Sequence, residues 1–254
     1  MSSARSILVW GAVAAQALFT GSWLLGGLAE ERGYRVSADG ISDLGALTAS
    51  HPWTVLTAQG IAGALTIAFA IFALGPALAG PGGRRPAGAW LVAASPLGLD
   101  NIWDVFFRLD CRAADPGCSQ SFGSGSWHAV AHLAISTLTF PIMVITPSVL
   151  AVQFRARPAW QGRAGLALAF SPVMFVGVTA FMGLHGRDGG GYAERVLALA
   201  ASTGTVLLAL GTRSRTPPSS GRGRRGCSAS DGSSVRTAIV GQDRSGPRYG
   251  RVWL

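Results

Sequence analysis

Six long apolar segments separated by polar loops restrict what this chain can fold into. A helix needs about 20 apolar residues to cross the hydrocarbon core of a bilayer. Only 13% of the 254 residues are charged, against the roughly 25% that is usual in soluble domains. The sequence therefore predicts an all-α fold, a polytopic membrane helix bundle of six transmembrane helices. The predicted segments are 7–28, 53–78, 87–107, 127–154, 164–184 and 193–210.

The composition changes near residue 212. The stretch 213–254 is rich in Arg, Gly, Ser and Pro, so it cannot bury an apolar core and is predicted to be disordered. We therefore expect a six-helix transmembrane domain at 1–212 and a disordered cytoplasmic tail at 213–254. The apolar run at 7–28 exceeds the roughly 7–15 residues of a signal-peptide core, and we expect it to stay in the mature protein.

The placement of arginine predicts the orientation of the helices. The formal net charge is +9, and every basic residue is Arg. One set of connections contains arginines and no acid before the tail, whereas acids accompany the arginines of the other set. Arginine-rich loops favour the cytoplasm, so both termini are predicted to be cytoplasmic. The arginines form no stripe interleaved with aromatic residues, so we expect membrane lipid, and no nucleic acid, as a partner.

Ionisable side chains collect at the ends of the segments on the predicted outer side. Such groups within a membrane span are costly and rare, and they mark candidate functional sites. Asp100 and Asp104 lie four residues apart in the third segment and share a helical face. The sequence thus predicts a layer of carboxylates and imidazoles near the outer leaflet. Its histidines are His51, His128, His132 and His185.

Two interpretations of the carboxylates stay open. In one, Asp104 pairs with Arg108 one turn later and Asp100 is hydrogen-bonded to a neighbouring helix, since charges within membranes are usually paired. In the other, Asp100 or Asp104 is catalytic, carries protons or binds a metal. Ser95-Pro96, in the same segment, predicts a kink, because proline removes a backbone donor and disfavours helix at the residue before it.

His128 and His132 have the i, i+4 spacing that lets two imidazoles meet one cation. With His185 or Asp100 as a third ligand, zinc would keep an open position for a water molecule acidified towards neutral pH. The alternative is that these histidines hydrogen-bond Asp104 or loop carbonyls. Zinc is therefore a candidate cofactor, and His128, His132 and His185 are its candidate ligands.

The three cysteines fall into two groups. Cys111 and Cys118 share one loop on the predicted outer side, where a disulfide bond closing a small loop is expected. Cys227 lies in the tail and is predicted to be inert. No CxxC motif occurs, which argues against a zinc ribbon or a thioredoxin-type site.

Several short strings resemble a known family through their order and membrane placement. Residues 41–45 read ISDLG, residues 107–111 read FRLDC, a histidine follows early in the fourth segment, and residues 191–196 read GYAERV. With six spans, they resemble the bacterial and archaeal membrane family catalogued as domain of unknown function 998. The resemblance implies an integral membrane protein of a bacterial or archaeal plasma membrane, without an assigned activity.

A looser likeness exists to membrane hydrolases of the alkaline ceramidase and adiponectin-receptor superfamily, which use a Ser, an Asp and three His around zinc. This chain has six predicted spans rather than seven, and its HxxxH motif opens the fourth segment instead of lying in the last. The side chains that would take those roles are Ser95, Asp100 or Asp104, His128, His132 and His185.

Three functions are consistent with these patterns. The first is an integral membrane protein of unassigned activity whose Asp/His cluster is structural or sensory. The second is a metal-dependent hydrolase acting on a lipid or amphiphile. The third is a small proton-coupled transporter with Asp100 and Asp104 as a relay, a role that breaks at Ser95-Pro96 and Ser171-Pro172 would favour. Whether the chain is an enzyme stays open at this point.

Overall fold

The computed structural model describes residues 3–31, 33–79 and 86–213. This part of the chain contains helices and loops without any β-strand, which confirms the all-α prediction. The predicted basic turn at 82–86 and the predicted tail lie largely outside the described residues, as does Cys227, so the disorder of the tail stays a prediction.

Five helices of the described chain are long and apolar enough to cross a membrane. Each lies close to a predicted segment, and the last extends several residues beyond its predicted bounds at both ends. The second helix continues through a π-helical turn, η2 (Ala70–Leu74), into α3 (Gly75–Leu78). The long helices are α1 (Ser3–Ala29), α2 (Pro52–Phe69), α6 (Trp127–Arg155), α7 (Ala164–Leu184) and α8 (Gly190–Arg213).

The third predicted segment is helical but broken into three pieces. It consists of α4 (Ala87–Ala93), the π-helical turn η3 (Pro96–Asp100) and α5 (Asn101–Phe106). Ser95 has extended backbone angles, φ −72° and ψ 170°, because a residue before proline is pushed out of the helical region. The kink predicted at Ser95-Pro96 is therefore present. The break predicted at Ser171-Pro172 is wrong, since α7 continues through Pro172.

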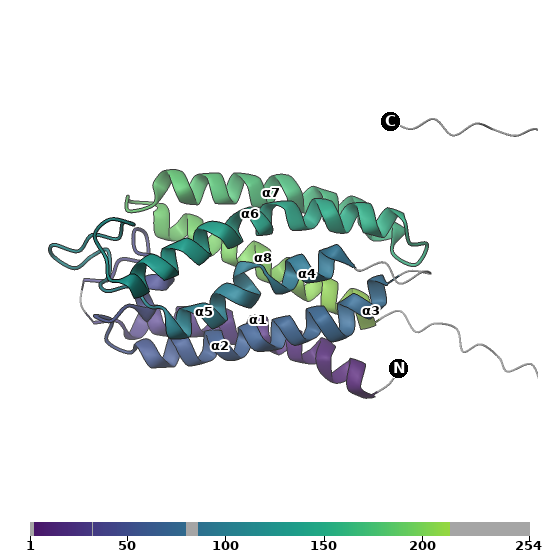
Figure 1. Ribbon diagram of the computed structural model, residues 1–254, viewed down its shortest axis with the longest axis horizontal. Coiled ribbons are helices and arrows are strands. Elements are labelled where there is room, and N and C mark those ends of the chain that lie inside the picture. The colour runs from purple at the N-terminus through teal and green to yellow at the C-terminus, as the bar shows by residue number, and fades with distance from the viewer. Residues whose placement is uncertain (1–2, 32, 80–85, 214–254) are drawn as a thin grey trace, which may run out of the picture. The chain divides into compact units, whose positions relative to one another are not determined.

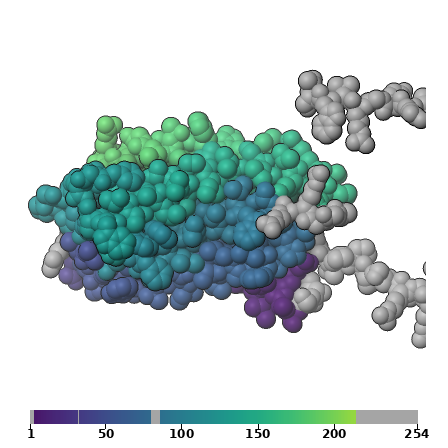
Figure 2. All heavy atoms as spheres, in the orientation of Figure 1, coloured from purple at the N-terminus to yellow at the C-terminus, as the bar shows by residue number. Residues whose placement is uncertain are grey.

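The helices form a closed bundle. In Figure 1, α1 contacts both α2 and α8, and α7 lies against α6 and α8. The broken segment fills the remaining side, with η3 and α5 against α2 and with α4 against α6. Figure 2 shows the atoms of this segment and of α6 covering one face between α2 and α7.

The two ends of the bundle differ in their loops. We call one the disulfide end, formed by residues 30–51, 107–126 and 185–189, and the other the arginine end, where α6 ends and α7 begins after Arg155 and Arg163. At the disulfide end, the 3-10 helix η1 (Ser42–Gly45) lies in the loop between α1 and α2. At the arginine end, the loop before α7 contains a second 3-10 turn, η4 (Gln161–Arg163).

The largest buried core lies towards the arginine end. Its members come from all the long helices and from α4, and the ring of Phe154 stacks on that of Trp160 with centroids 4.7 Å apart. On the outer surface of the bundle, large apolar side chains such as Phe72, Leu138 and Phe175 are exposed. An exposed apolar surface of this extent marks contact with lipid or protein, as expected for a multi-pass membrane protein.

Candidate functional site

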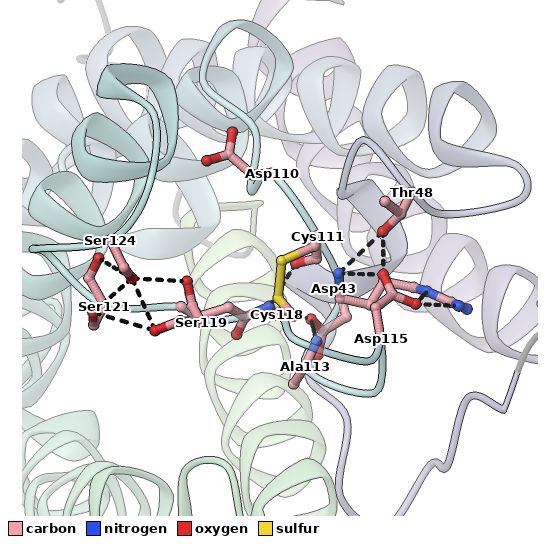
Figure 3. The surroundings of a disulfide bond; sticks show 12 residues. Asp43, Thr48, Asp110, Cys111, Ala113, Asp115, Cys118, Ser119, Ser121 and Ser124 are labelled. Carbon is pink, nitrogen blue, oxygen red and sulfur yellow. Dashed lines mark hydrogen bonds and ion pairs between the residues drawn. A yellow bond between two sulfur atoms is a disulfide. The ribbon is translucent and has the colours of Figure 1, made fainter.

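The loop between α5 and α6 is closed by a disulfide bond. Cys111 and Cys118 are bonded, with their Cα atoms 5.9 Å apart. Within this loop, Asp115 accepts hydrogen bonds from the backbone N–H and the guanidinium of Arg112, and from the hydroxyl of Thr48 (Figure 3). Burial alone would raise the pKa of Asp115, but these bonds hold that pKa below its usual value. The loop is thereby tied to the segment before α2.

Arg112 connects the same loop to the end of α1. Its side chain is 3% exposed and forms ion pairs with Glu30 at 2.7 Å and with Asp115 at 2.6 Å. The Glu30 carboxylate, 2% exposed, also accepts hydrogen bonds from the backbone N–H and the hydroxyl of Ser50. Buried charges persist when they are paired and fully hydrogen-bonded, as here.

Asp43, from the ISDLG string, is a buried acceptor at the centre of the disulfide end. Its carboxylate accepts hydrogen bonds from the backbone N–H groups of Gly40 and Ala113 and from the side chain of Gln120. Burial raises the pKa of Asp43, and these three bonds act in the opposite direction. The string therefore joins the loop before α2 to the loop before α6.

The FRLDC string also ties the loops of the disulfide end to one another. Arg108 donates to the carbonyl oxygens of Gly45 and Ala46, each at 2.8 Å, so the predicted Asp104–Arg108 pair is wrong. Asp110 accepts from the backbone N–H and the hydroxyl of Ser126, and these bonds lower its pKa. Ser126 in turn caps the first turn of α6.

The GYAERV string places one cation and one carboxylate at the start of α8. The Arg195 guanidinium is buried and donates to the carbonyl oxygens of Val36, Asp39 and Gly191. Glu194 accepts a hydrogen bond of 2.9 Å from the backbone N–H of Ile41. Glu194 lines the cavity described below, which its position beside a loop in the sequence does not predict.

Inside the bundle, α6 presents polar side chains to the broken third segment. His132 Nδ1 lies 2.8 Å from Asp104 Oδ1 and 3.2 Å from the carbonyl oxygen of Phe107. The hydrogen bond from Nδ1 is aligned with the carbonyl, so Asp104 makes a close ionic contact without an aligned hydrogen bond. Both hydroxyls that bind Asp100, those of Ser136 and Thr139, come from α6 as well.

These groups line a cavity of about 450 Å³. Its volume falls in the range of roughly 300–1,000 Å³ that is typical of small-molecule sites. The exposed lining residues are Phe122 and His185 at the disulfide end and Thr137, Pro141 and Met182 along α6 and α7. Its polar side chains include Gln59, Asp100, Asn101, Asp104, His132, Ser136, His185 and Glu194.

Gln59 is the unexpected member of this set. It lies in the apolar helix α2, is 3% exposed and lines the cavity, yet its side-chain amide has no hydrogen-bond partner among the described residues. Asn101, which also lines the cavity, donates to the carbonyl oxygen of Leu97 at 3.3 Å. Buried amides normally find partners, so the cavity offers hydrogen bonds that the described chain does not use.

The histidines do not gather as the metal hypothesis predicts. His132 and His185 line the cavity, but His128 lies outside it, with its ring 3.8 Å from that of Trp127 and its Nδ1 3.3 Å from the Phe106 carbonyl oxygen. Among the residues that the structure describes, no three His, Cys, Asp or Glu side chains are close enough to hold a metal ion. Zinc binding stays a prediction that the structure does not test.

Sequence patterns also leave out several lining residues. Gln59 was visible as an amide in an apolar segment. Ser136, which lines the cavity, and Thr139, which binds Asp100 from behind it, resemble ordinary helix residues because hydroxyls often bond within their own helix. The signal that would have found them is their spacing from His132. Residues four and seven positions apart share one helical face.

The comparisons with known proteins agree with this architecture. A family model described as "Protein of unknown function (DUF998)" matches residues 13–211, which include most of α1, the helices from α2 to α7, and α8 except its last two residues. The chain belongs to this family. The resemblance carried by the three strings is thereby confirmed, and all three strings act as anchors of the loops at the disulfide end. No curated protein and no solved structure matches the chain.

Proposed function

We propose that the chain is a multi-pass protein of a bacterial or archaeal plasma membrane that binds a small ligand in the cavity at its disulfide end. In this proposal both termini are cytoplasmic, and the cavity opens towards the outside. The ligand-binding step serves a sensory role, in which occupancy of the cavity is reported through the helices that line it.

The orientation is supported by two independent features. The arginine end is also where α1 begins and α8 ends, and arginine-rich connections favour the cytoplasm. Disulfide bonds form and persist in oxidising compartments, and Cys111–Cys118 lies at the opposite end. Both features support a disulfide end that faces the outside of the cell.

The unused amide of Gln59 is the observation that carries the ligand-binding proposal. A polar cluster that only holds helices together satisfies its own groups, as Arg112 and Asp43 do in the loops. The Gln59 side chain instead faces a cavity large enough for a small molecule and has no partner among the described residues. Burial of such a group without a hydrogen bond costs about 1–3 kcal/mol by protein mutational data. A ligand, or the water it displaces, removes that cost.

Accessibility of the cavity from outside is the test. Ala198 lines the cavity one helical turn after Glu194, so an Ala198→Cys variant in a Cys227→Ser background places a single reduced thiol there. Methyl methanethiosulfonate, a small neutral reagent, is expected to modify this thiol in spheroplasts. Thr54→Cys, at an exposed position beside the same end, is the matched control for reagent delivery. Modification at the Thr54→Cys thiol without any at the Ala198→Cys thiol would refute the proposal.

A second candidate function, a proton-coupled transporter, is favoured by the break in the third segment. Discontinuous helices near the bilayer midplane are typical of transporter binding sites, and the π-helical turn η3 ends at Asp100 beside the cavity. In this case proteoliposomes would show proton flux that Asp104→Asn abolishes. If proton flux is absent, or equal in wild type and Asp104→Asn, the transporter function is excluded and ligand binding remains the proposed function.

A further inference from the structure

We infer that the ligand of this cavity is an organic cation, an amine or quaternary ammonium that carries an apolar body. The inference rests on the proposed ligand-binding function and names the class of ligand. It is drawn from the charges, the aromatic side chains and the size of the cavity.

The charged groups of the cavity are mostly acidic. Three carboxylates line it, those of Asp100, Asp104 and Glu194, and none of the described lining residues is Arg or Lys. Arg108 and Arg195 are the arginines nearest in sequence to these carboxylates, and both donate hydrogen bonds to backbone carbonyl oxygens of the loops.

Within the described chain, one of the three carboxylates forms a close ion pair. Asp104 contacts the imidazole of His132 at 2.8 Å. Asp100 accepts from two hydroxyls, and Glu194 accepts from one backbone N–H. Neutral donors orient a carboxylate but do not compensate its charge, and the low dielectric of a buried site strengthens attraction for a cation. Asp100 and Glu194 form no close ion pair within the described chain; His132 acts on both at longer range, and Arg195 acts on Glu194. A cationic ligand would give each of the two carboxylates a direct ionic partner.

The wall formed by α6 and α7 fits the apolar part of such a ligand. The rings of Phe140 and Phe181 lie with centroids 5.2 Å apart, and Met143 and Val178 line the same wall. Aromatic faces attract ammonium groups, more strongly where water is excluded. The amide of Gln59, on α2, is available to orient a polar substituent.

A bare metal ion fits this cavity less well than an organic cation. A metal site requires several ligands within about 2–2.6 Å of one point, and no three acidic, His or Cys side chains of the described chain converge in that way. A cavity of about 450 Å³ leaves space for a molecule of many atoms. The carboxylates lie around this space rather than at one point.

Charge selectivity at the Ala198→Cys thiol tests the inference. The probes are 2-(trimethylammonium)ethyl methanethiosulfonate and 2-sulfonatoethyl methanethiosulfonate, which have similar size and opposite charge. After normalisation to the exposed Thr54→Cys thiol, the cationic reagent is expected to react about tenfold faster or more than the anionic one. Adding Asp100→Asn or Glu194→Gln is expected to reduce this ratio severalfold. Asp188→Asn, an exposed acid of the same end, is the matched control and leaves the ratio unchanged.

Protection of the Ala198→Cys thiol by an added ligand is a second measurement, and it requires no substitution of Asp100 or Glu194. Benzyltrimethylammonium is expected to slow modification of the Ala198→Cys thiol by the neutral reagent, and phenylmethanesulfonate is not. Equal reaction rates for the two charged reagents, or protection by the anion alone, would overturn the inference. Both results are readable even if Asp100→Asn or Glu194→Gln fails to fold.

The two proposals fail in different ways. If the neutral reagent does not reach the Ala198→Cys thiol, the proposed function itself is wrong. If the neutral reagent reacts but neither charge selectivity nor cation-specific protection appears, the cavity is open and only the organic-cation inference is wrong.

Discussion

The arginine end and the disulfide end of this bundle are held together by different forces. At the arginine end, helices meet through small and apolar residues, and Ala70, Ala73 and Leu74 have no exposed surface. At the disulfide end, ion pairs and hydrogen bonds of Arg112, Asp43 and other loop residues hold the helix ends together around a cavity.

The comparison teaches where a small bundle can keep space for a ligand. Close packing keeps voids small, because each apolar contact is lost when a gap opens; the cavity beside Phe154 and Trp160 at the arginine end measures about 100 Å³, against about 450 Å³ at the disulfide end. Hydrogen-bonded loops can fix the helix ends from outside the core, so the core beneath them need not be filled. The anchoring of the loops and the presence of the cavity are therefore linked.

The largest expected effect comes from breaking the loop anchor at the disulfide end. Arg112→Ala leaves the buried carboxylate of Glu30 without its cationic partner. Removing one member of a buried pair costs about 3–5 kcal/mol, and we expect a loss in that range in the free energy of unfolding in detergent micelles, followed by circular dichroism. Arg155→Ala, at an exposed position of the arginine end, is the control and changes stability by less than about 0.5 kcal/mol. Equal losses in the two variants would contradict the proposed difference between the ends.

The disulfide bond contributes a smaller but separate part. Cys118→Ser opens a loop that spans seven positions, and the chain-entropy relation gives about 2.5 kcal/mol for a loop of this size. Thermal unfolding should therefore occur at lower temperature in Cys118→Ser, and a reducing agent should lower the midpoint of the wild type alone. Cys227→Ser is the matched control, with no expected change. If the reducing agent shifts wild type and Cys118→Ser alike, the bond does not stabilise the end.

Added volume should distinguish the more closely packed arginine end from the disulfide end, which has the larger cavity. Ala73→Leu introduces methyl groups where no surface is exposed, and overpacking costs about 1–3 kcal/mol. Ala198→Leu introduces the same groups into the cavity, where we expect a change of less than about 1 kcal/mol of either sign. Denaturant unfolding of the two variants measures the difference. A larger loss for Ala198→Leu than for Ala73→Leu would mean that the cavity is not an open space.

The smallest effect concerns the contact between α2 and the broken segment. A Cβ atom at Gly63 would lie 2.6 Å from the carbonyl oxygen of Gly98, so Gly63→Ala must displace η3 and is expected to cost about 1 kcal/mol. At Gly21, in α1, no atom lies within 4 Å of an added Cβ, and the alanine there gains up to about 1 kcal/mol of helix propensity. Opposite signs of the two changes in unfolding free energy are the expected result. The same sign in both would remove the steric explanation.

Much of the fold was predictable because hydrophobic segments must match the thickness of a membrane. The six segments followed from their length and apolarity, the break at Ser95-Pro96 from its proline, and the common depth of Asp100, Asp104 and His132 from the alternating direction of the segments. The hydrogen-bond and ring-contact partners of these and neighbouring residues could not be predicted from the sequence. Arg108 donates to backbone carbonyl oxygens and does not pair with Asp104. The ring of His128 contacts that of Trp127 and does not line the cavity.

The sequence by itself determined which residues lie at which depth along the bundle, because length and apolarity fix where each helix starts and ends. Only the tertiary structure decided which of them face one another, since facing depends on the rotation of each helix about its axis and on its neighbours. That rotation brought Gln59 and Glu194 into the cavity with Asp100 and placed His128 outside it. Residue spacing within one helix carries no information about the rotation of the next.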